Sequence, residues 1–386
     1  MTAGGPRVLF VDHAGVLGGA ELSLLDLAAA LGDRAEVLLL ADGPFRAALE
    51  TRAIAVSVEA LGALKGVKKE TRLPSPAALA DAFRLARRVA SHARRRAVIY
   101  ANSQKAFVVA AFAGVMARRP VIWHLRDILA PPHFSASNVR AAVTLANVRA
   151  AHVIGNSRAT AAAFIQAGGR ASLVSVVHNG IDPAPFDAVT DEVVRATRAE
   201  LGIPEAAFVV ALFGRFHHWK GQQVLLQALA DLPGTHALFV GAPLFGEEAF
   251  DSALRAQAVR LGVAERSHFV GFRSDVPALM SAADVVAHAS VYPEPFGRVI
   301  VEGMLAGRPV IATRAGGVEE IVTDGETGVL VPPDDPAALA AAIAALRSEP
   351  ARAASLAARG AAHARAQFSV ASMVRGVEAV LQTVAG

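Results

Sequence analysis

A regular alternation of short apolar runs and longer alanine-rich stretches constrains the fold of this chain most strongly. The apolar runs lack the every-second-residue pattern of a sheet with one wet face, which is typical of parallel strands covered on both sides. Helix-length stretches separate the runs, so the pattern predicts repeated strand–helix–strand units. In the first half we expect a helix over 20–31 and strands over 7–12, 36–41, 97–101, 121–123 and 152–155.

A second series of strands begins after a break in this pattern. Residues 178–192 are rich in Pro, Asn, Asp and Gly and lack apolar periodicity, which predicts a linker. From about Pro336 onward the chain consists almost entirely of helix formers. The strands expected between these two segments are 207–213, 236–241, 268–270, 284–288, 309–313 and 328–331.

We therefore expect an α/β protein with two Rossmann-like, doubly wound domains, since 386 residues exceed what one core usually serves. The N-terminal domain is expected over 1–182 and the C-terminal domain over 183–368. A helix over 369–386 is expected to cross back to the N-terminal domain. Two such sheets that face each other imply a central cleft, because doubly wound sheets bind ligands beyond the carboxyl ends of their strands.

The composition excludes several kinds of chemistry and indicates a location. The chain has no cysteine, which excludes disulfides, zinc–thiolate sites and a thiol nucleophile. Its first residues lead into a strand-like run without the charged and apolar regions of a signal peptide. The longest apolar run, 106–117, is too short to span a bilayer. We expect a cytoplasmic protein.

Positive charge is concentrated in the first half, where residues 1–190 carry 22 Lys/Arg and 13 Asp/Glu. Leu79, Phe83, Ala86 and Ala90 are expected to pack one face of a helix over 76–96 on the sheet. Two interpretations of the basic residues remain: peripheral contact with anionic lipid at the inner face of the membrane, or a solvated arginine face. We expect no nucleic-acid partner. The basic residues concerned are Lys65, Lys68, Lys69, Arg72, Arg84, Arg87, Arg88, Arg94, Arg95 and Arg96.

The segment 291–335 carries the strongest functional signal. Glu294 lies in a proline-flanked loop, and Glu302 follows after seven intervening residues, inside a helix expected to begin near Gly297. The start of a helix offers unpaired N–H groups and a positive dipole end, which suit a diphosphate. Two carboxylates beside it suit the hydroxyl groups of a sugar and a ribose. Because glycine has no side chain, the Gly316–Gly317 pair allows another group to approach the backbone closely at this point.

A second signal, over 213–229, directly follows the first strand of the second domain. Arg215 and Lys220 flank a strand-to-helix turn, where two cations can neutralise a diphosphate. His217, His218 and Trp219, between them, are expected on the surface of the loop. Two further signals lie in the first domain. Gly18 and Gly19 form a glycine-rich turn that opens the first helix, and His124 is expected to end a strand on the cleft side, with a pKa suited to proton transfer.

These motifs, in this order along essentially the whole chain, resemble glycosyltransferase family 4, whose members are retaining enzymes of the GT-B fold. The resemblance implies that Glu294 holds the donor sugar at the reacting face and that Glu302 binds the ribose. Arg215 and Lys220 would help a nucleoside diphosphate leave without a metal, and His124 would act near the donor sugar and the acceptor. Backbone contacts to phosphate or sugar are implied for Gly18, Gly19, Phe296, Gly297 and Val299, and the segment 270–275 places Phe272 and Arg273 beside the nucleobase.

The resemblance implies a retaining transfer of a hexosyl group from a UDP- or GDP-linked sugar, which is a co-substrate and not a resident cofactor, to a hydroxyl acceptor. The acceptor class (glycan, lipid or small metabolite) stays open. The sequence contains no Asp-x-Asp, which speaks against the metal-dependent GT-A type and for a metal-independent enzyme. Two alternatives remain: a GT-B sugar-nucleotide epimerase, which needs no acceptor pocket, and a catalytically silent partner subunit.

Overall fold

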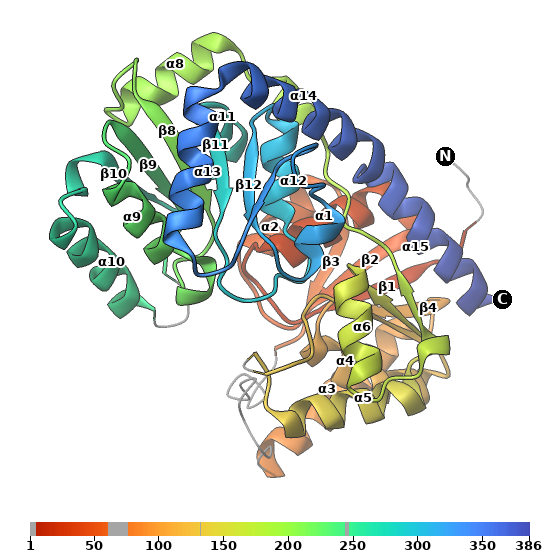
Figure 1. Ribbon diagram of the computed structural model, residues 1–386. Coiled ribbons are helices and arrows are strands. Elements are labelled where there is room, and N and C mark those ends of the chain that lie inside the picture. The colour runs from red at the N-terminus through yellow and green to blue at the C-terminus, as the bar shows by residue number, and fades with distance from the viewer. Residues whose placement is uncertain (1–4, 61–75, 132, 244–246) are drawn as a thin grey trace. The chain divides into compact units, whose positions relative to one another are not determined.

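The computed structural model describes residues 5–60, 76–131, 133–243 and 247–386, and these divide into two compact units. Unit 1 comprises Met1–Gly180 and Val370–Gly386, and unit 2 comprises Ile181–Ser369. The division therefore falls two residues before the first boundary expected from the sequence and one residue after the second. Each unit is built on its own parallel sheet (Figure 1), as predicted.

The described part of unit 1 forms a seven-stranded parallel sheet in the order β3-β2-β1-β4-β5-β6-β7. Its strands are β1 (Val8–Asp12), β2 (Ala35–Leu39), β3 (Ala55–Val58), β4 (Val98–Ala101), β5 (Val121–Leu125), β6 (His152–Gly155) and β7 (Val174–Val176). Its helices are α1 (Gly19–Leu31), α2 (Pro44–Thr51), α3 (Pro76–Ala93), α4 (Gln104–Ala117), α5 (Ala136–Arg149), α6 (Arg158–Gln166) and α15 (Val370–Ala385).

The described residues of unit 2 form a six-stranded parallel sheet in the order β10-β9-β8-β11-β12-β13. Its strands are β8 (Phe208–Phe213), β9 (Thr235–Val240), β10 (Ser267–Gly271), β11 (Val285–His288), β12 (Val310–Thr313) and β13 (Val329–Val331). Its helices are α7 (Ala184–Asp187), α8 (Asp191–Glu200), α9 (Gln222–Ala230), α10 (Glu248–Arg260), α11 (Val276–Ser281), α12 (Arg298–Leu305), α13 (Pro336–Ser348) and α14 (Pro350–Gln367).

Each central strand is buried on both faces, which explains the unbroken apolar runs. In β1, Val8 and Phe10 belong to one apolar cluster, whereas Leu9 and Val11 belong to the cluster on the opposite face. The same split occurs in β8, where Val209 and Val210 pack into different clusters. Helices therefore cover both sides of each sheet, as a doubly wound fold requires.

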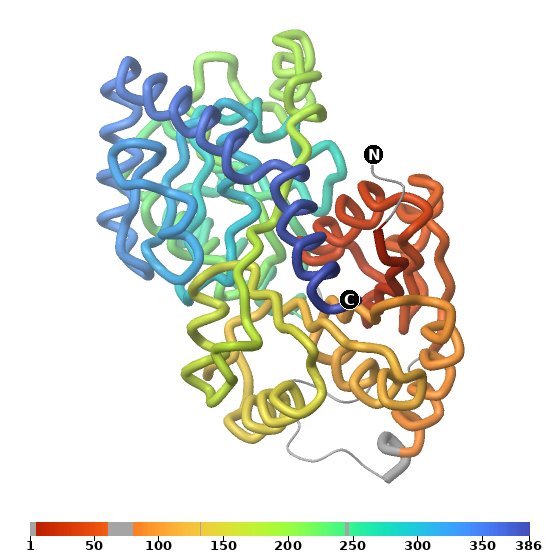
Figure 2. The backbone as a smooth tube through the Cα atoms, turned by 90° about the vertical axis from the view of Figure 1, so that its right-hand side faces the viewer, coloured from red at the N-terminus to blue at the C-terminus, as the bar shows by residue number. Residues whose placement is uncertain are grey.

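The C-terminal helix α15 completes the core of unit 1. Its residues Met373, Val377 and Leu381 are buried in the same cluster as Val8 and Phe10 of β1, and α15 contacts α1. Figure 2 shows this helix in blue among the red and orange segments that begin the chain. The preceding helix α14 remains with unit 2, so a single terminal helix returns to the first unit.

Several sequence predictions of local structure are wrong. Strands β3 and β7 were not predicted, because they are edge strands of four and three residues that are not fully buried, so their apolar signal is weak. The predicted linker 178–192 contains α7 and the start of α8. Phe83 of α3 is 55% exposed and does not pack on the sheet, since the buried stripe of that helix instead runs through Leu85, Ala86, Val89 and Ala90. The side chain of Leu79 lies outside the described part of the chain.

Each sheet reverses its strand order at one place near its centre. In unit 1 the reversal lies between β1 and β4, and in unit 2 it lies between β8 and β11. At such a switch point the connections leave toward opposite faces, so the carboxyl ends of the two strands border an open crevice where ligands bind. None of the helices in the described part of the chain is long and apolar enough to cross a membrane.

Candidate active site

Two charged residues meet at the switch point of unit 2. Lys220 lies at the end of a short 3-10 turn (His218–Lys220) after β8, and Glu294 lies in the loop after β11. The Lys220 ammonium donates to both carboxylate oxygens of Glu294, at 3.0 Å to Oε1 and 2.8 Å to Oε2. The structure thus joins two of the predicted site residues directly, across 74 positions of sequence.

Glycines place both charged residues by letting backbone segments come close together. Gly221, with φ +72°, follows Lys220, and a Cβ at this position would lie 1.8 Å from the carbonyl oxygen of Ala289. Gly316, also with φ +72°, passes so close to Glu294 that a Cβ would lie 2.4 Å from its carbonyl oxygen. The close approach predicted for the Gly316–Gly317 pair is therefore present, and Gly317 N donates to Glu294 O at 2.8 Å.

Two neighbours that the sequence analysis missed also contact the Glu294 carboxylate. Ser290 Oγ donates to Oε2 at 3.0 Å, and His288 Nε2 lies 3.3 Å from the same oxygen. Both residues are buried, with 2% of Ser290 and 7% of His288 exposed. The available signal was their position: His288 ends β11, and polar residues at the carboxyl end of a central parallel strand border the ligand crevice.

Glu294 is ionised despite its burial. Only 18% of its side chain is exposed, and this desolvation by itself would raise the pKa of the carboxyl group. The Lys220 ammonium and the contact with His288 outweigh desolvation and hold the pKa of Glu294 well below its ordinary value of 4.5. The residue is a carboxylate throughout the physiological range, suited to accept hydrogen bonds and unsuited to donate a proton.

Arg215 and His217 lie in the same turn as Lys220. Burial lowers the pKa of the Arg215 guanidinium, and the Glu247 carboxylate opposes this shift. His217 was predicted on the surface but is 8% exposed, and its Nε2 lies 3.1 Å from Glu247. Burial and the charge of Arg215 lower the pKa of His217 to about 4, so its ring is neutral at pH 7.

The helix predicted near Gly297 begins there. Gly297, with φ +105°, is the N-cap of α12, and a glycine brings no side chain to cover the N–H groups of the first turn. Glu302 lies within this helix, where its carboxylate accepts from Arg298 Nε at 2.6 Å. Phe296 is 2% exposed and packs against Phe368, so its side chain belongs to the core, while Val299 lies partly buried in the first turn.

Phe272 and Arg273, expected beside a nucleobase, follow β10 of unit 2. Phe272 is 70% exposed, the largest exposed fraction among the large apolar side chains of the described residues. The Arg273 guanidinium donates to Asp275 at 2.8 Å and to Glu200 at 2.6 Å. These two ion pairs fix the arginine, whereas the ring offers an open face.

In unit 1, the predicted glycine turn follows β1. Gly18 is the N-cap of α1, which begins at Gly19, and the Gly18 N–H donates to Glu21 Oε2 at 3.0 Å. Burial, and then the neighbouring Asp12 carboxylate, raise the pKa of Glu21 to about 7.

His124 lies inside β5 and not at its end, because β5 extends to Leu125 and pairs His124 with Ile154 of β6. The prediction that His124 ends the strand is therefore wrong by one residue. The His124 side chain is fully buried, and its Nδ1 is hydrogen-bonded to the Tyr100 hydroxyl. Burial, with a smaller contribution from Arg126, lowers the pKa of His124 well below its ordinary value, so the ring is neutral.

A buried polar chain at the strand ends of unit 1 was missed from the sequence. Asp12 Oδ2 accepts from Asn102 Nδ2 at 2.5 Å, and Asn102 Oδ1 accepts from Arg126 Nε at 3.0 Å. A further contact joins Arg126 to Asn179. Asp12 ends β1, Asn102 follows β4 and Arg126 follows β5, so the chain crosses the switch point of this sheet.

Within the described residues, no group of three or more His, Asp or Glu side chains is arranged to hold a metal ion. What the unit 2 switch point offers is an ammonium, a fixed carboxylate, an arginine and the open start of a helix. These groups suit a ligand that carries phosphate and several hydroxyl groups.

Comparison with known proteins identifies the family. A model of the glycosyl transferase 4-like domain matches residues 18–180, and a model of glycosyl transferases group 1 matches residues 193–363. The crystal structure of Anabaena HepE in complex with UDP and glucose has 43% identity and a TM-score of 0.90, covering 98% of this chain and 100% of that chain. A Rickettsia africae glycosyltransferase, at 20% identity and a TM-score of 0.84 over 98% of both chains, shares the fold.

A curated relative is similar over a shorter stretch. The D-inositol 3-phosphate glycosyltransferase of Corynebacterium efficiens is 40% identical over 181 residues, which are 45% of this chain and 42% of that protein. The match thus spans less than half of the length of that relative. The fold and the matched families together define a glycosyltransferase of the GT-B fold. The chain belongs to the family 4 type of these enzymes, as its motifs predicted.

The geometry of the Lys220–Glu294 pair generates a prediction on stability. We expect Lys220→Met to lower the free energy of unfolding by about 1–3 kcal/mol at pH 7, because it leaves a largely buried carboxylate without its cation. Urea titrations from pH 3 to pH 8 measure the effect. Since the pKa of Glu294 is depressed in the folded state, the stabilisation by its ionised form is present above about pH 4.5 and is lost as the pH falls further. The difference in the free energy of unfolding between the wild-type chain and Lys220→Met should therefore become smaller below that pH.

The matched control is Arg352→Met, which breaks an exposed ion pair with Glu349 on α14. It should change the free energy of unfolding by less than about 0.5 kcal/mol. An equal loss in both variants would mean that the Lys220–Glu294 contact does not stabilise unit 2.

Proposed function

We propose that this chain transfers a hexosyl group from a UDP-linked sugar to a hydroxyl acceptor, with retention at the anomeric carbon and without a metal ion. The observation that carries the proposal is the direct contact of Lys220 with Glu294 at the switch point of unit 2. This contact places a cation that can bind the diphosphate, Lys220, beside a fixed carboxylate that can bind the sugar, Glu294. Arg215 and the start of α12 lie next to this pair in sequence and add positive charge.

The similarity to HepE supports a uridine donor. HepE has been crystallised with UDP, with UDP-glucose, and with UDP and glucose together, at 42–43% identity to this chain. A glucosyl group from UDP-glucose is therefore the first donor to test. In this proposal Glu302 binds the ribose, and Phe272 stacks its exposed ring on the base.

The proposed step is attack from the face on which the leaving group departs. The bond between the anomeric carbon and the β-phosphate oxygen breaks, and the acceptor oxygen forms a new bond on the same face. The departing phosphate oxygen takes the acceptor proton, so UDP and the glycoside are the products and retention follows. Lys220 and Arg215 stabilise the charge that develops on the diphosphate, a role that gains strength where water is excluded.

The central experiment is incubation with UDP-glucose labelled in the sugar, with and without EDTA. We expect slow release of labelled glucose when no acceptor is present, unchanged by the chelator. Turnover that is abolished by EDTA and restored by Mg²⁺ or Mn²⁺ would contradict metal independence. Isomerised sugar nucleotide would instead identify an epimerase, and absence of any turnover with UDP- and GDP-sugars would favour a silent subunit.

The second test is kinetic. Arg215→Ala and Lys220→Ala should each lower the rate about 10- to 1000-fold, equivalent to about 1.4–4 kcal/mol of transition-state stabilisation. Glu294→Ala should lose at least as much, because it orients the reacting sugar. Arg352→Ala on α14 serves as the control with unchanged rate. Near-normal rates in the first three variants would place the donor site elsewhere.

We further propose that the enzyme works in the cytoplasm with the outer surface of α3, α4 and α5 against anionic lipid. These helices pack side by side, and they expose Phe83 on α3, Phe112 and Val115 on α4, and Val148 on α5. Exposed apolar side chains beside arginines are typical of a peripheral membrane contact.

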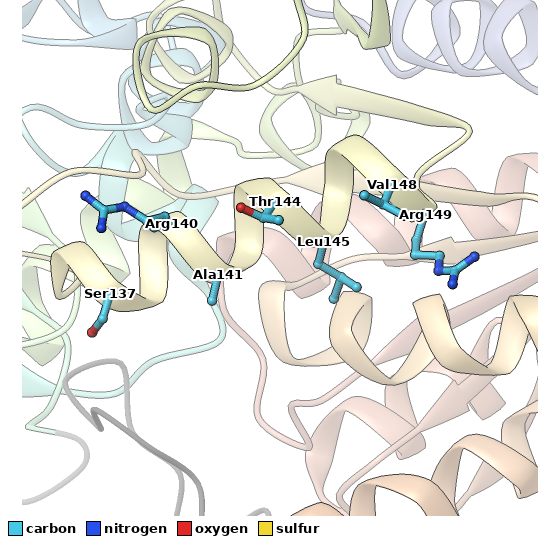
Figure 3. Close-up of a pocket in the computed structure, with 7 residues that line it drawn as sticks. All are labelled: Ser137, Arg140, Ala141, Thr144, Leu145, Val148 and Arg149. Carbon is cyan, nitrogen blue, oxygen red and sulfur yellow. The ribbon is translucent and has the colours of Figure 1, made fainter.

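The outer face of α5 adds a shallow depression that carries two arginines (Figure 3). None of its lining residues is a predicted site residue. They are Ser137, Arg140, Ala141, Thr144, Leu145, Val148 and Arg149.

The structure reduces the positive charge expected on α3. Arg88 pairs with Glu59 at 2.8 Å, Arg84 pairs with Asp81, and Arg96, just beyond the helix, pairs with Glu36. Arg87, Arg94 and Arg95 are exposed. The basic cluster of Lys65, Lys68, Lys69 and Arg72 lies outside the described residues. The membrane contact therefore depends more on apolar side chains than the sequence indicated.

Vesicle co-sedimentation tests this contact. We expect binding to anionic vesicles and not to neutral ones, weakened near 0.5 M salt, and weakened further by Phe112→Ser combined with Val148→Ser. A matched control replaces exposed apolar residues of unit 2, with Val193→Ser and Val259→Ser. Absence of binding to anionic vesicles at low salt would discard the membrane contact and favour a small dissolved acceptor.

A further inference from the structure

His288 and Ser290 are two buried residues beside Glu294 that no predicted motif includes. The task assigned to them below is in donor binding and therefore rests on the proposed function. His288 Nε2 and Ser290 Oγ both contact Oε2 of Glu294, at 3.3 and 3.0 Å, and they lie 3.1 Å from each other. With Lys220 Nζ at 2.8 Å, three groups converge on one carboxylate oxygen.

Lys220 faces two competing demands. In the structure its ammonium contacts both oxygens of Glu294. In the proposed reaction the same ammonium is needed at the diphosphate. When the lysine turns to the phosphates, the Glu294 carboxylate loses its nearest cation in a place where only 18% of its side chain reaches water. An isolated buried carboxylate tends to take up a proton or to turn away toward solvent.

We propose that His288 and Ser290 are positioning residues that keep the Glu294 carboxylate ionised and aimed at the donor sugar once Lys220 has turned to the diphosphate. Their hydrogen bonds go to Oε2, which leaves Oε1 for a sugar hydroxyl after Lys220 departs. The titratable groups in contact with the carboxylate are Lys220, from the turn after β8, and His288, from β11. His288 thus becomes the remaining titratable donor.

The hydrogen-bond partners of His288 distinguish its two ring nitrogens. Its Nδ1 is buried without a hydrogen-bond partner among the described residues, whereas Nε2 faces an acceptor. A neutral ring therefore carries its proton on Nε2 and donates toward Glu294. The Ser290 hydroxyl can donate to Glu294 Oε2, while its oxygen accepts from the N–H at Nε2 of His288.

The rigidity of the supporting strands lets these donors act as fixed points. His288 is the last residue of β11 and pairs with Ala312 of β12 in the sheet. The carbonyl of Ser290 accepts from Thr313 Oγ1 at 2.8 Å, which ties the loop to the end of β12. The two donors therefore stay in place when the long lysine side chain moves.

The test measures the ionisation of the Glu294 carboxylate and does not depend on enzyme activity. Lys220→Met removes the ammonium permanently, so no ligand has to bind. Glutamate residues are labelled with 13C at the side-chain carboxyl, and the Glu294 resonance is assigned by its loss in Glu294→Gln. In the Lys220→Met background we expect His288→Leu to raise the pH midpoint of Glu294 by at least one unit and Ser290→Ala to raise it by less. His288→Gln, which keeps a donor near the Nε2 position, should restore it.

Controls separate positioning from packing. His268→Leu removes another partly buried histidine of the same sheet, from β10, and should leave the Glu294 midpoint unchanged. Circular dichroism shows which variants fold, and His288→Gln keeps the test valid if His288→Leu does not. An unchanged midpoint in folded His288→Leu, or an equal rise in His288→Gln, would overturn the proposal.

A second readout concerns the sugar alone. In a chain with Lys220 intact, His288→Leu should weaken the affinity for UDP-glucose at least tenfold while changing the affinity for UDP less than twofold, as measured by calorimetry. Equal loss for both ligands would overturn the positioning role while leaving the proposed function intact. If the wild-type chain binds neither UDP nor UDP-glucose, the proposed function is contradicted, and so is the contact of Glu294 with the donor sugar. The pH midpoint of the Glu294 resonance still shows whether His288 and Ser290 keep the carboxylate ionised.

Discussion

A carboxylate held at the end of a buried strand is the constraint around which unit 2 is organised. The Glu294 side chain is ionised although little of it is exposed to water, so the chain must supply a cation and hydrogen-bond donors at fixed distances. Lys220, His288 and Ser290 provide them, and Gly221 and Gly316 allow the backbone to bring them close. A substitution that disturbs any of these contacts acts on the same charge, which makes them energetically coupled.

Much of the fold was predictable because parallel strands buried on both faces have a strong apolar signal. The end of β8 also follows from the sequence, since Gly214 and Arg215 come directly after its apolar run. The edge strands β3 and β7 give no such signal because they are short and incompletely buried. The packing expected of Phe83 is wrong because helical spacing alone does not tell which of two neighbouring faces a helix buries.

The candidate site was predictable to the extent that its residues stand in one linear motif. Glu294, Glu302 and Gly297 fall within nine positions, and the sequence gives their relation to α12 directly. The contact of Lys220 with Glu294 depends on the strand order, which brings together residues 74 positions apart. His288 and Ser290 were missed because each is an ordinary residue in an apolar run, and only the fold shows that their side chains point to the same carboxylate.

The return of α15 to unit 1 has a consequence for how the protein is made. Val8 and Phe10 obtain part of their final packing from Met373 and Leu381, which are synthesised near the end of the chain. At ribosomal speeds residues 177–369, between β7 and α15, take on the order of 10–40 s to emerge, so the first sheet waits that long with part of one face uncovered. The strands of unit 2, β8 to β13, are all synthesised within this interval. The sheet that is made first is thus the last to receive all of its covering helices, and the apolar residues that α15 covers stay without that cover until the end of synthesis.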